Sequence, residues 1–305
     1  MIFLSKKNNN NPPNALTRAV ACVQIRSATL AKNGDLYSSY HYAAQSVVDL
    51  LRAYSIQEDY ISANELAKCN YCESKLEHGV TLQVEHYRPK AKVDATDNNN
   101  VAHPGYYWLG LEWSNLLLSC PKCNGKGAKG NRFPIRGPRA VPVHPVDGQG
   151  VLSRLDCFAD RQPLLAEDAL LLNPEIDHPE NFLTFNANGY ISSHGQDTLR
   201  GDTSIEIYRL NRDTLVAARI DVLNKFMKRI NIDIAARMIG TIGDETLLYN
   251  FKAIVREMLE RKSPKEEFTL WANHFNDKVE ACVISFLPVP YEIMFRQAYA
   301  EVLAE

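Results

Sequence analysis

The chain has 305 residues, of which 45% are hydrophobic and 23% are charged, and its formal net charge is −2. This composition is that of an ordinary globular protein and excludes a fibrous or low-complexity chain, while the length favours two lobes around a central module. The near-neutral charge gives no overall indication of nucleic-acid binding, so such a function would have to come from local features.

The N-terminus lacks the long apolar run of a signal peptide, and no stretch approaches the roughly 20 apolar residues of a membrane span. We therefore expect a cytoplasmic protein with no membrane contact, in which cysteines stay reduced. Residues 5–14 are polar and contain consecutive prolines, which predicts a loose arm. Helical spacing extends from Ala15 to about Ala67 and is strongest over Tyr40–Tyr54, with Ser38 or Ser39 as the N-cap.

From Lys68 the pattern changes to short strands and turns. Cys69-Asn-Tyr-Cys72 predicts a tight turn, and apolar and polar residues alternate over 80–86 as they do in a half-buried strand. Residues 94–105 are rich in Asp, Asn, Pro and Gly, which indicates a loop. The aromatic and apolar residues of 106–119 suit a small core, and a second cysteine pair then leads into a short helix or turn at 124–130.

The remainder of the chain is predicted to be mainly helical. Residues 133–150 are rich in Pro and Gly and mark a linker, and Asn188-Gly189 predicts a β-hairpin. Helical spacing follows over 203–223, 247–259 and 290–303.

Together these elements predict an α+β fold that is mostly helical. We divide the chain into an N-terminal arm and helical segment (1–66), a small module that contains both cysteine pairs (67–140), and a linker, hairpin and helical region (141–305).

Four of the seven cysteines form two Cys-x-x-Cys pairs, Cys69 with Cys72 and Cys120 with Cys123. A Cys-x-x-Cys turn directs two thiolates at one point, and two such turns complete a tetrahedral zinc site with no open position, which is structural. A redox dithiol explains one pair and not two. The 47 residues between the pairs exceed the usual gap of about 15–20 residues in such sites, which leaves room for a functional insert.

The charge of the chain is unevenly distributed. Between positions 86 and 139 there are nine Lys or Arg and three Asp or Glu, so this segment carries about +6 and the rest of the chain about −8. A basic patch is typical of phosphate contact, although a solvated basic face gives the same pattern. The candidate contacts to nucleic acid are Arg88, Lys90, Lys126, Lys129 and Arg132.

Two further strings lie near or between the cysteine pairs: Glu85-His86-Tyr-Arg-Pro-Lys90, and Trp113-Ser-Asn115-Leu-Leu-Leu-Ser-Cys120-Pro-Lys-Cys123-Asn124. With these residues the segment 68–136 resembles the HNH, or ββα-metal, endonucleases. The resemblance implies a zinc-clamped ββα-metal module that hydrolyses DNA phosphodiester bonds with a divalent metal ion.

The resemblance also implies a role for each residue of the motif. His86 would be the general base that takes a proton from water, and Asn115 would fix the orientation of its ring. Glu85 and Asn124 would bind the catalytic ion through oxygen, a ligand set that favours Mg²⁺ or Mn²⁺ over zinc. The third motif position is Asn124 where many relatives have His, so two protein ligands and several waters are expected.

A looser likeness extends further along the chain. Tyr106-Tyr-Trp-Leu, Leu171-Leu-Asn-Pro174, Asn188-Gly189 and Leu210-Asn211-Arg212 resemble the HNH subunit of Septu-type bacterial anti-phage systems, which also accompanies some retrons. That resemblance implies an effector nuclease that acts beside an ATPase of the ABC/SMC-like class. The acidic regions that flank the basic segment would be its binding surface.

Two alternatives stay open on the sequence alone. A zinc-ribbon adapter that binds protein or nucleic acid without cleaving it accounts for the cysteines and leaves Glu85, His86, Asn115 and Asn124 as coincidence. An HNH nuclease that cleaves RNA uses the same residues as one that cleaves DNA.

Overall fold

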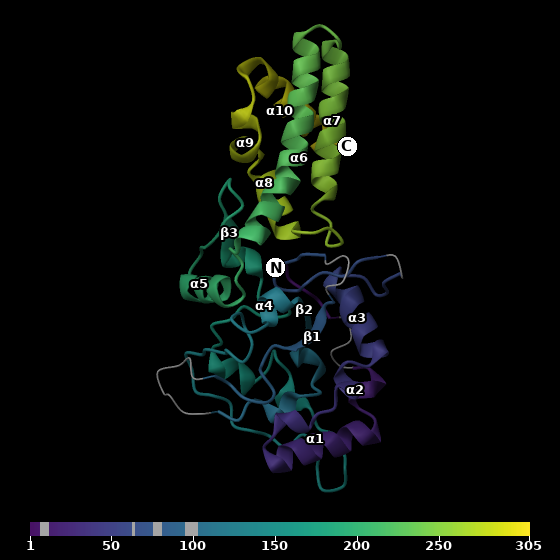
Figure 1. Ribbon diagram of the computed structural model, residues 1–305, viewed down its shortest axis with the longest axis vertical. Helices are drawn as coiled ribbons and strands as arrows, with labels where there is room; N and C mark the ends of the chain where they lie inside the picture. Colours follow the sequence, from purple (N-terminus) through teal and green to yellow (C-terminus); the bar gives the residue numbers. More distant parts are fainter. Residues whose placement is uncertain (7–11, 63–64, 76–80, 95–102) are drawn as a thin grey trace. The chain divides into compact units, whose positions relative to one another are not determined.

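The computed structural model of the protein describes residues 1–6, 12–62, 65–75, 81–94 and 103–305. The chain forms two compact units: Met1–Leu183 together with Ser193–Leu210, and Thr184–Ser192 together with Asn211–Glu305 (Figure 1). Parts of the predicted arm at 5–14 and of the predicted loop at 94–105, and the first residue of the strand predicted at 80–86, lie outside the described residues.

The first unit contains a short antiparallel hairpin followed by a short helix. Strand β1 (Gln83–His86) pairs with β2 (Leu116–Ser119) in a register that places His86 opposite Leu116. All four residues of β2 are buried. Helix α4 (Pro121–Asn124) begins with a proline, whose missing N–H would have no helical partner at that position.

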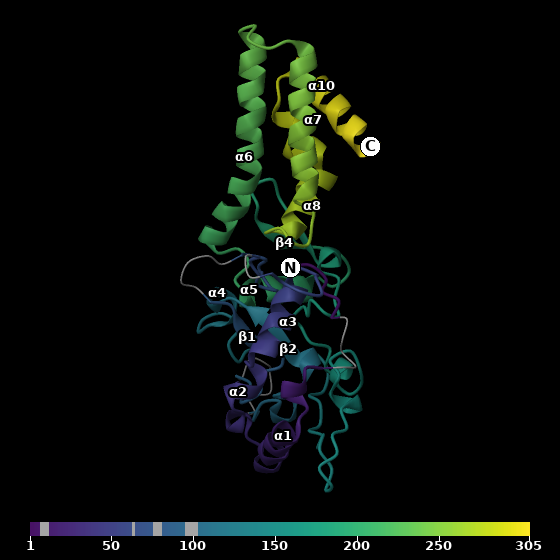
Figure 2. The ribbon, with the colours of Figure 1, turned by 90° about the vertical axis from the view of Figure 1, so that its right-hand side faces the viewer.

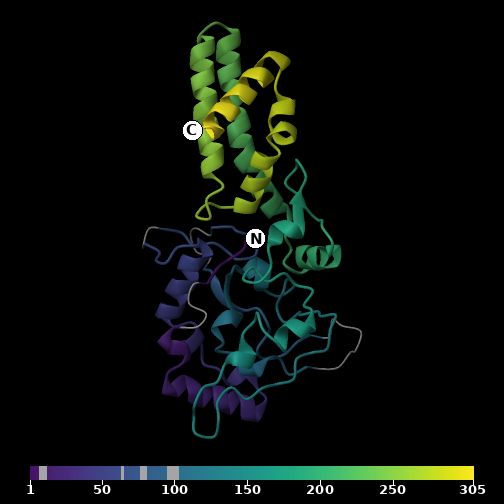
Figure 3. The ribbon, with the colours of Figure 1, turned by 180° about the vertical axis from the view of Figure 1, so that it is seen from behind.

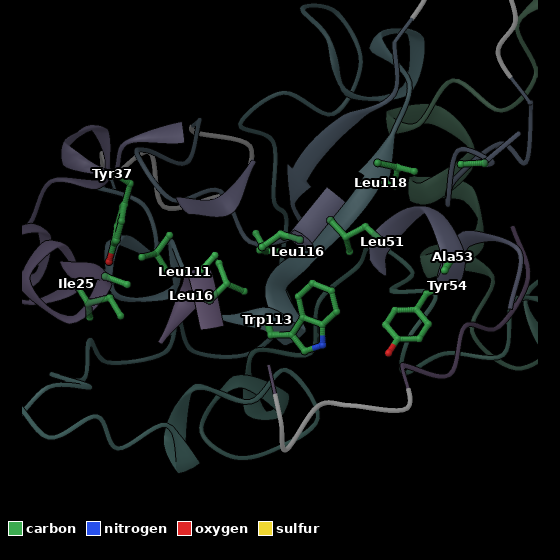
Figure 4. Packing of buried hydrophobic residues seen from close by; sticks show 14 of the residues in the cluster. Leu16, Ile25, Tyr37, Leu51, Ala53, Tyr54, Leu111, Trp113, Leu116 and Leu118 are labelled. Atoms are coloured by element: carbon green, nitrogen blue, oxygen red, sulfur yellow. The ribbon is translucent and has the colours of Figure 1, made fainter. Parts of the chain in front are cut away.

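Three helices precede this hairpin in the first unit: α1 (Ala19–Ala31), α2 (Ser39–Tyr42) and α3 (Gln45–Ser55). Helix α3 packs against β2, and Leu51 and Tyr54 of α3 belong to the same buried cluster as Trp113 and Leu116 (Figure 4). The rings of Tyr54 and Trp113 lie with their centroids 6.1 Å apart. Because this apolar contact buries β2, the N-terminal helices hold the hairpin in place.

The single helix predicted over 40–54 is interrupted. Helix α2 ends at Tyr42 and α3 begins at Gln45, because Ala44 has a non-helical backbone, with φ −58° and ψ 143°, and is the N-cap of α3. Ser38 caps α2, and its side chain accepts a hydrogen bond from the backbone N–H of Tyr40. A Ser cap was expected, and the break was not visible in the spacing of the apolar residues.

Residues 133–183 of the first unit contain mainly loops. Short 3₁₀ helices lie at Leu155–Cys157, Leu164–Glu167 and Pro179–Asn181, and helix α5 (Thr198–Ile207) follows later in the chain. Arg200 of α5 donates two hydrogen bonds, 2.8 and 2.6 Å long, to the carboxylate of Asp177. This ion pair attaches α5 to the loop segment.

The second unit is a group of helices that follows a small hairpin. Its elements are β3 (Leu183–Phe185), β4 (Ile191–Ser193), α6 (Asp213–Met238), α7 (Asp244–Glu260), α8 (Thr269–Asp277), α9 (Val279–Cys282) and α10 (Val289–Leu303). Helices α6 and α7 lie side by side, and α10 packs along α7 (Figures 2 and 3). The predicted turn between β3 and β4 is confirmed, with Gly189 at φ +71° where glycine is favoured.

The observed α+β class agrees with the sequence, and the sheets have only two strands each. The division into units differs from the one drawn at 66 and 140, because both of those positions fall inside the first unit. The reason is packing: the N-terminal helices share a buried cluster with the β1–β2 hairpin, so they form no separate body. Within the described residues, none of the helices combines the length and the apolarity needed to span a membrane.

Candidate functional site

The two Cys-x-x-Cys pairs meet in the first unit. Cys69, Cys72, Cys120 and Cys123 are buried, and their four sulfur atoms all lie within 4.8 Å of one another. The Sγ atoms of Cys72 and Cys120 are 3.8 Å apart. Sulfurs about 3.8 Å apart are what a tetrahedral ion with Zn–S bonds of about 2.3 Å requires.

Two hydrogen bonds join the first cysteine turn to strand β2 of the hairpin. The N–H of Asn70 donates to the carbonyl of Leu118 over 2.8 Å, and the side chain of Asn70 accepts from the N–H of Leu118 over 2.6 Å. The second turn starts directly after β2 and continues into α4. The cluster therefore fixes the end of β2 and the start of α4 relative to the first turn.

The donor set fits a zinc ion. Burial raises the pKa of the Cys69 thiol, so a thiolate at this place requires the charge of a bound cation. Four thiolates leave no open coordination position, which makes the site structural. The cluster can thus hold a metal such as zinc, as the sequence predicted.

His86 ends β1 and is buried. Its Nε2 lies 2.9 Å from the carbonyl oxygen of Gly110, and its ring packs edge-on against Tyr42 with centroids 5.0 Å apart. The pKa of His86 is lowered to about 3, mainly by burial and to a smaller extent by the positive charges of Lys90 and Lys129, while the hydrogen bond with Gly110 opposes the shift. The ring is therefore neutral at pH 7. Because a carbonyl oxygen only accepts, Nε2 carries the proton and Nδ1 keeps its lone pair.

Glu85 lies beside His86 and is held by two side chains. The ammonium group of Lys129 is 2.5 Å from Oε1 of Glu85, and Asn124 forms a side-chain hydrogen bond with the same carboxylate. Burial raises the pKa of Glu85, while Lys129 and Asn124 act in the opposite direction. The structure thus brings Glu85, His86 and Asn124 together, although 38 residues separate Asn124 from His86 in sequence.

Asn115 connects the two sides of the hairpin. Its Oδ1 accepts a hydrogen bond of 2.8 Å from the N–H of Arg88, and its Nδ2 donates to the carbonyls of Arg88 and Leu109. Arg88 lies two residues after His86, and Leu109 precedes the Gly110 carbonyl that holds the imidazole. Asn115 therefore positions both the chain that carries His86 and the segment that carries its hydrogen-bond acceptor.

The five basic residues selected from the sequence are placed differently from one another. Lys126 is exposed, and Lys90 and Arg132 are half-buried. Arg88 and Lys129 are buried, and they pair with Glu167 and Glu85, respectively. The burial of these two residues does not support the phosphate contact expected from the sequence, because their cationic groups already face acidic partners.

A second, oxygen-based ion site at Glu85 and Asn124 is compatible with the residues present. A carboxylate and an amide are ligands that hard cations such as Mg²⁺ accept. The ammonium of Lys129 lies at the same carboxylate, so a divalent ion there must share Glu85 with Lys129 or displace it. Among the described residues, no other group of three or more His, Cys, Asp or Glu besides the four cysteines has the geometry of a metal cluster.

Sequence reasoning missed two residues of this site and gave a third a different role. Gly110 supplies a backbone carbonyl, Tyr42 supplies a ring from a different helix, and Lys129 acts through an ion pair rather than at the surface. No local pattern marks the first two. For Lys129, burial was the missing information, since the surrounding glycines and lysines suggest an exposed loop.

The chain is similar to Septu proteins. It is 33% identical over 166 residues to Septu protein PtuB of Bacillus mycoides (strain KBAB4), which covers 54% of this chain and 50% of that protein. It is 29% identical over 192 residues to Septu protein PtuA of the same strain, covering 59% of this chain and 24% of that protein. Septu protein PtuB of Bacillus thuringiensis is 28% identical over 166 residues, covering 53% of this chain and 44% of that protein.

This chain thus spans about half the length of the PtuB relatives and about a quarter of PtuA. No protein-family model matches the chain, and no solved structure matches it. The Septu part of the likeness expected from the sequence is therefore confirmed: Septu proteins PtuA and PtuB are homologues of this chain.

Proposed function

We propose that the protein is a metal-dependent HNH endonuclease that hydrolyses DNA phosphodiester bonds in anti-phage defence. One observation carries the proposal: a hairpin held by four cysteines presents a neutral imidazole, His86, beside the paired side chains of Glu85 and Asn124. An adapter protein needs the cysteines alone, and it gains nothing from a buried histidine beside a carboxylate.

His86 acts as the general base in this proposal. The carbonyl of Gly110 keeps the proton on Nε2, so the lone pair of Nδ1 takes a proton from the attacking water. A pKa of about 3 makes the isolated ring a weak base. An anionic phosphodiester bound beside it raises that pKa, because nearby negative charge favours the imidazolium form.

Glu85 and Asn124 hold the catalytic ion. An ion such as Mg²⁺ or Mn²⁺ at this place would offset the negative charge that develops on the phosphate as the bond breaks. Lys129 opposes the rise in the pKa of Glu85 that burial causes, and Asn115 maintains the backbone on both sides of His86. The cysteine cluster fixes α4, which carries Asn124, relative to β1.

The defence role rests on the similarity to Septu proteins PtuA and PtuB, two proteins whose shared system name suggests that they act together. We propose that this chain acts with a partner of the ABC/SMC-like ATPase class. The acidic charge is concentrated at 140–210, which has eleven Asp or Glu and four Lys or Arg. The segment 211–305 is nearly balanced, with fourteen Asp or Glu and thirteen Lys or Arg. The partner surface proposed for the flanks can therefore be tested on each segment separately.

Plasmid nicking tests the nuclease proposal. Purified protein is assayed with Mg²⁺ or Mn²⁺, with EDTA, and as the variants His86→Ala and His144→Ala, where His144 is an exposed histidine that serves as the matched control. We expect His86→Ala to lose about 100-fold or more of the activity, which is the usual contribution of a general base, and His144→Ala to keep it.

Retained zinc content in His86→Ala would show that the loss is chemical rather than structural. Equal cleavage by His86→Ala and the unchanged protein would rule out this site. If the protein cleaves RNA but no DNA under any of these conditions, the RNase alternative is favoured. If it cleaves neither, the adapter alternative is favoured.

Co-purification tests the partner proposal. We expect deletion of Asn211–Glu305 to remove binding of the ATPase and to leave zinc in the four-cysteine cluster, because all four cysteines belong to the first unit. Retained binding after this deletion would place the partner on the acidic segment 140–210 instead, which substitution of its exposed acids by amides would then check.

A further inference from the structure

A fully buried carboxylate, Glu167, lies in the loop segment 133–183 of the first unit. It ends the short 3₁₀ helix Leu164–Glu167, and its exposed fraction is 0%. Burial of a charged side chain is costly unless the group is paired and hydrogen-bonded. Glu167 lies outside the segment 68–136 that resembles the HNH nucleases, and it has no role in the proposed nuclease mechanism.

Three groups donate hydrogen bonds to this carboxylate. Oε2 accepts from Nε of Arg88 over 2.8 Å, and Oε1 accepts from the hydroxyl of Tyr106 over 2.5 Å and from the N–H of Ala140 over 2.9 Å. The hydroxyl of Tyr106 in turn accepts a hydrogen bond of 2.7 Å from Arg139. Both oxygens therefore have partners, and every one of these partners is a donor, which suits an ionised carboxylate.

The contact with Arg88 holds the chain that follows His86. Besides the bond to Glu167, Nη2 of Arg88 donates to the carbonyl of Leu164 over 2.9 Å, so the 3₁₀ helix fixes the guanidinium group at two atoms. The backbone N–H of Arg88 donates to Asn115 over 2.8 Å, and its carbonyl accepts from the same amide over 3.1 Å. Arg88 is thus held at its side chain and at its backbone, two residues after His86.

The contact with Tyr106 holds the segment that carries the hydrogen-bond acceptor of His86. The carbonyl of Tyr106 accepts from the N–H of Leu109 over 2.8 Å within a short 3₁₀ helix, whose C-cap is Gly110. The carbonyl oxygen of Gly110 lies 2.9 Å from Nε2 of His86. Glu167 consequently joins the two segments that meet in this hydrogen bond.

We propose that Glu167 is a positioning residue for His86. Its carboxylate links Arg88 to Tyr106, and this link keeps the carbonyl of Gly110 against the imidazole. Hydrogen bonds to a charged group are about twice as strong as neutral ones, and a buried pair favours the one arrangement that matches its geometry. The role of the imidazole as a base rests on the proposed nuclease function, whereas its position can be measured directly.

Glu167→Gln tests the link with a side chain of nearly the same shape. Because all three partners of the carboxylate donate, the amide nitrogen of the glutamine must face a donor, and a hydrogen bond is lost. The matched control is Asp177→Asn, which replaces another buried, arginine-paired carboxylate of the first unit. Asp177 accepts from Arg200 and from the N–H of Asn173, which lie outside both linked segments.

Exchange of the Nε2 proton of His86 with solvent is the first readout. It is followed by NMR on the ¹⁵N-labelled full chain, and the signal is assigned by its absence in His86→Ala. A buried, hydrogen-bonded N–H exchanges slowly, because the structure must open before it exchanges. We expect exchange to be about tenfold faster or more in Glu167→Gln and unchanged in Asp177→Asn. This measurement does not require nuclease activity.

Plasmid nicking supplies the second readout. We expect kcat of Glu167→Gln to fall about tenfold or more with KM unchanged, because a misplaced base weakens the transition state and not the binding of substrate. In the His86→Ala background the same change should have no further effect, since the imidazole that it positions is absent. The zinc content of each variant shows whether the four-cysteine cluster persists.

Tyr106→Phe provides a second variant if Glu167→Gln does not fold. It removes one hydroxyl from the link and keeps the pair of Arg88 with Glu167. It should also speed the exchange of the Nε2 proton of His86.

Two results would overturn the proposal. One is exchange of the Nε2 proton that is unchanged in both Glu167→Gln and Tyr106→Phe, which would show that the Gly110 carbonyl stays in place without the link. The other is an equal loss of kcat with and without the His86 imidazole, which would make Glu167 a residue of general stability. Absence of cleavage by the unchanged protein would instead contradict the proposed nuclease function, and the exchange measurement would still decide whether Glu167 positions the ring.

Discussion

The two units of the molecule differ in where their ion pairs lie. In the first unit several charged side chains are buried and paired, as Lys129 is with Glu85, Arg88 with Glu167, and Arg154 with Glu112. In the second unit most ion pairs lie at the surface, and Arg229 with Glu257 is representative, with both side chains nearly half exposed. The core of the second unit is apolar, with Phe226, Phe251 and Phe295 buried.

This difference indicates which interactions stabilise each unit. Surface ion pairs contribute about 0–1 kcal/mol, so the second unit is held by its apolar faces. Buried ion pairs are costly to desolvate and contribute mainly when their geometry is right, so they select one arrangement of the loops that carry them. The first unit has short strands and long loops, and it uses such pairs and the cysteine cluster where regular elements are lacking.

Removal of metal from the four-cysteine cluster should have the largest effect, and it should destabilise the first unit only. We expect the variant Cys120→Ser to lose bound metal and the ordered packing around Trp113, because structural zinc contributes about 10 kcal/mol or more to small folds. Helical content from the second unit should remain. Metal analysis and near-ultraviolet circular dichroism measure both effects, with Cys22→Ser, a half-exposed cysteine outside the cluster, as the control. A Cys120→Ser protein with unchanged packing would show that the cluster does not support the hairpin.

The free energy of unfolding that is lost when one basic side chain is removed should differ between the units. Lys129→Met leaves the buried carboxylate of Glu85 without its counter-ion and should cost about 3–5 kcal/mol of unfolding free energy. Arg229→Met removes an exposed partner of Glu257 and should cost less than about 1 kcal/mol. Urea denaturation of both variants measures the two values. Similar values would mean that burial does not set the strength of these pairs.

The sequence predicted those features of the first unit that depend on short spacing. The four cysteines and the strand that ends at His86 are local patterns of residue type, and the structure has both as expected. The short helix or turn predicted at 124–130 is displaced, because helix α4 covers Pro121–Asn124 and ends at Asn124. In the second unit, the helices near 247–259 and 290–303 and the turn at Asn188-Gly189 followed from periodicity and turn chemistry.

The remaining features depend on tertiary contacts that no local pattern encodes. The carbonyl of Gly110 meets His86 from 24 residues away, and Glu167 meets Arg88 from 79 residues away. Basic residues in a glycine-rich loop look exposed in the sequence, and only the packing shows that Lys129 is buried against Glu85. The unit boundary near 184 and 211 could not be predicted either, because it follows from which segments share a core.

The smallest expected effect is a pH dependence that belongs to the first unit alone. Burial raises the pKa of Glu175 to about 7, with Lys6 opposing the shift, whereas the unfolded carboxyl titrates near its usual value of 4.5. Between these values the folded state binds more protons than the unfolded state, so this carboxyl makes stability fall as pH rises from about 4.5 to 7. Urea denaturation at pH 5 and pH 8 measures this effect. The free energy of unfolding should fall more between pH 5 and pH 8 for the unchanged protein than for Glu175→Gln. Glu257→Gln, an exposed carboxyl of the second unit, should not alter the pH dependence in this way. If Glu175→Gln loses as much stability over this range as the unchanged protein, Glu175 is ionised in the folded state, and its pair with Lys6 resembles the surface pairs of the second unit despite its burial.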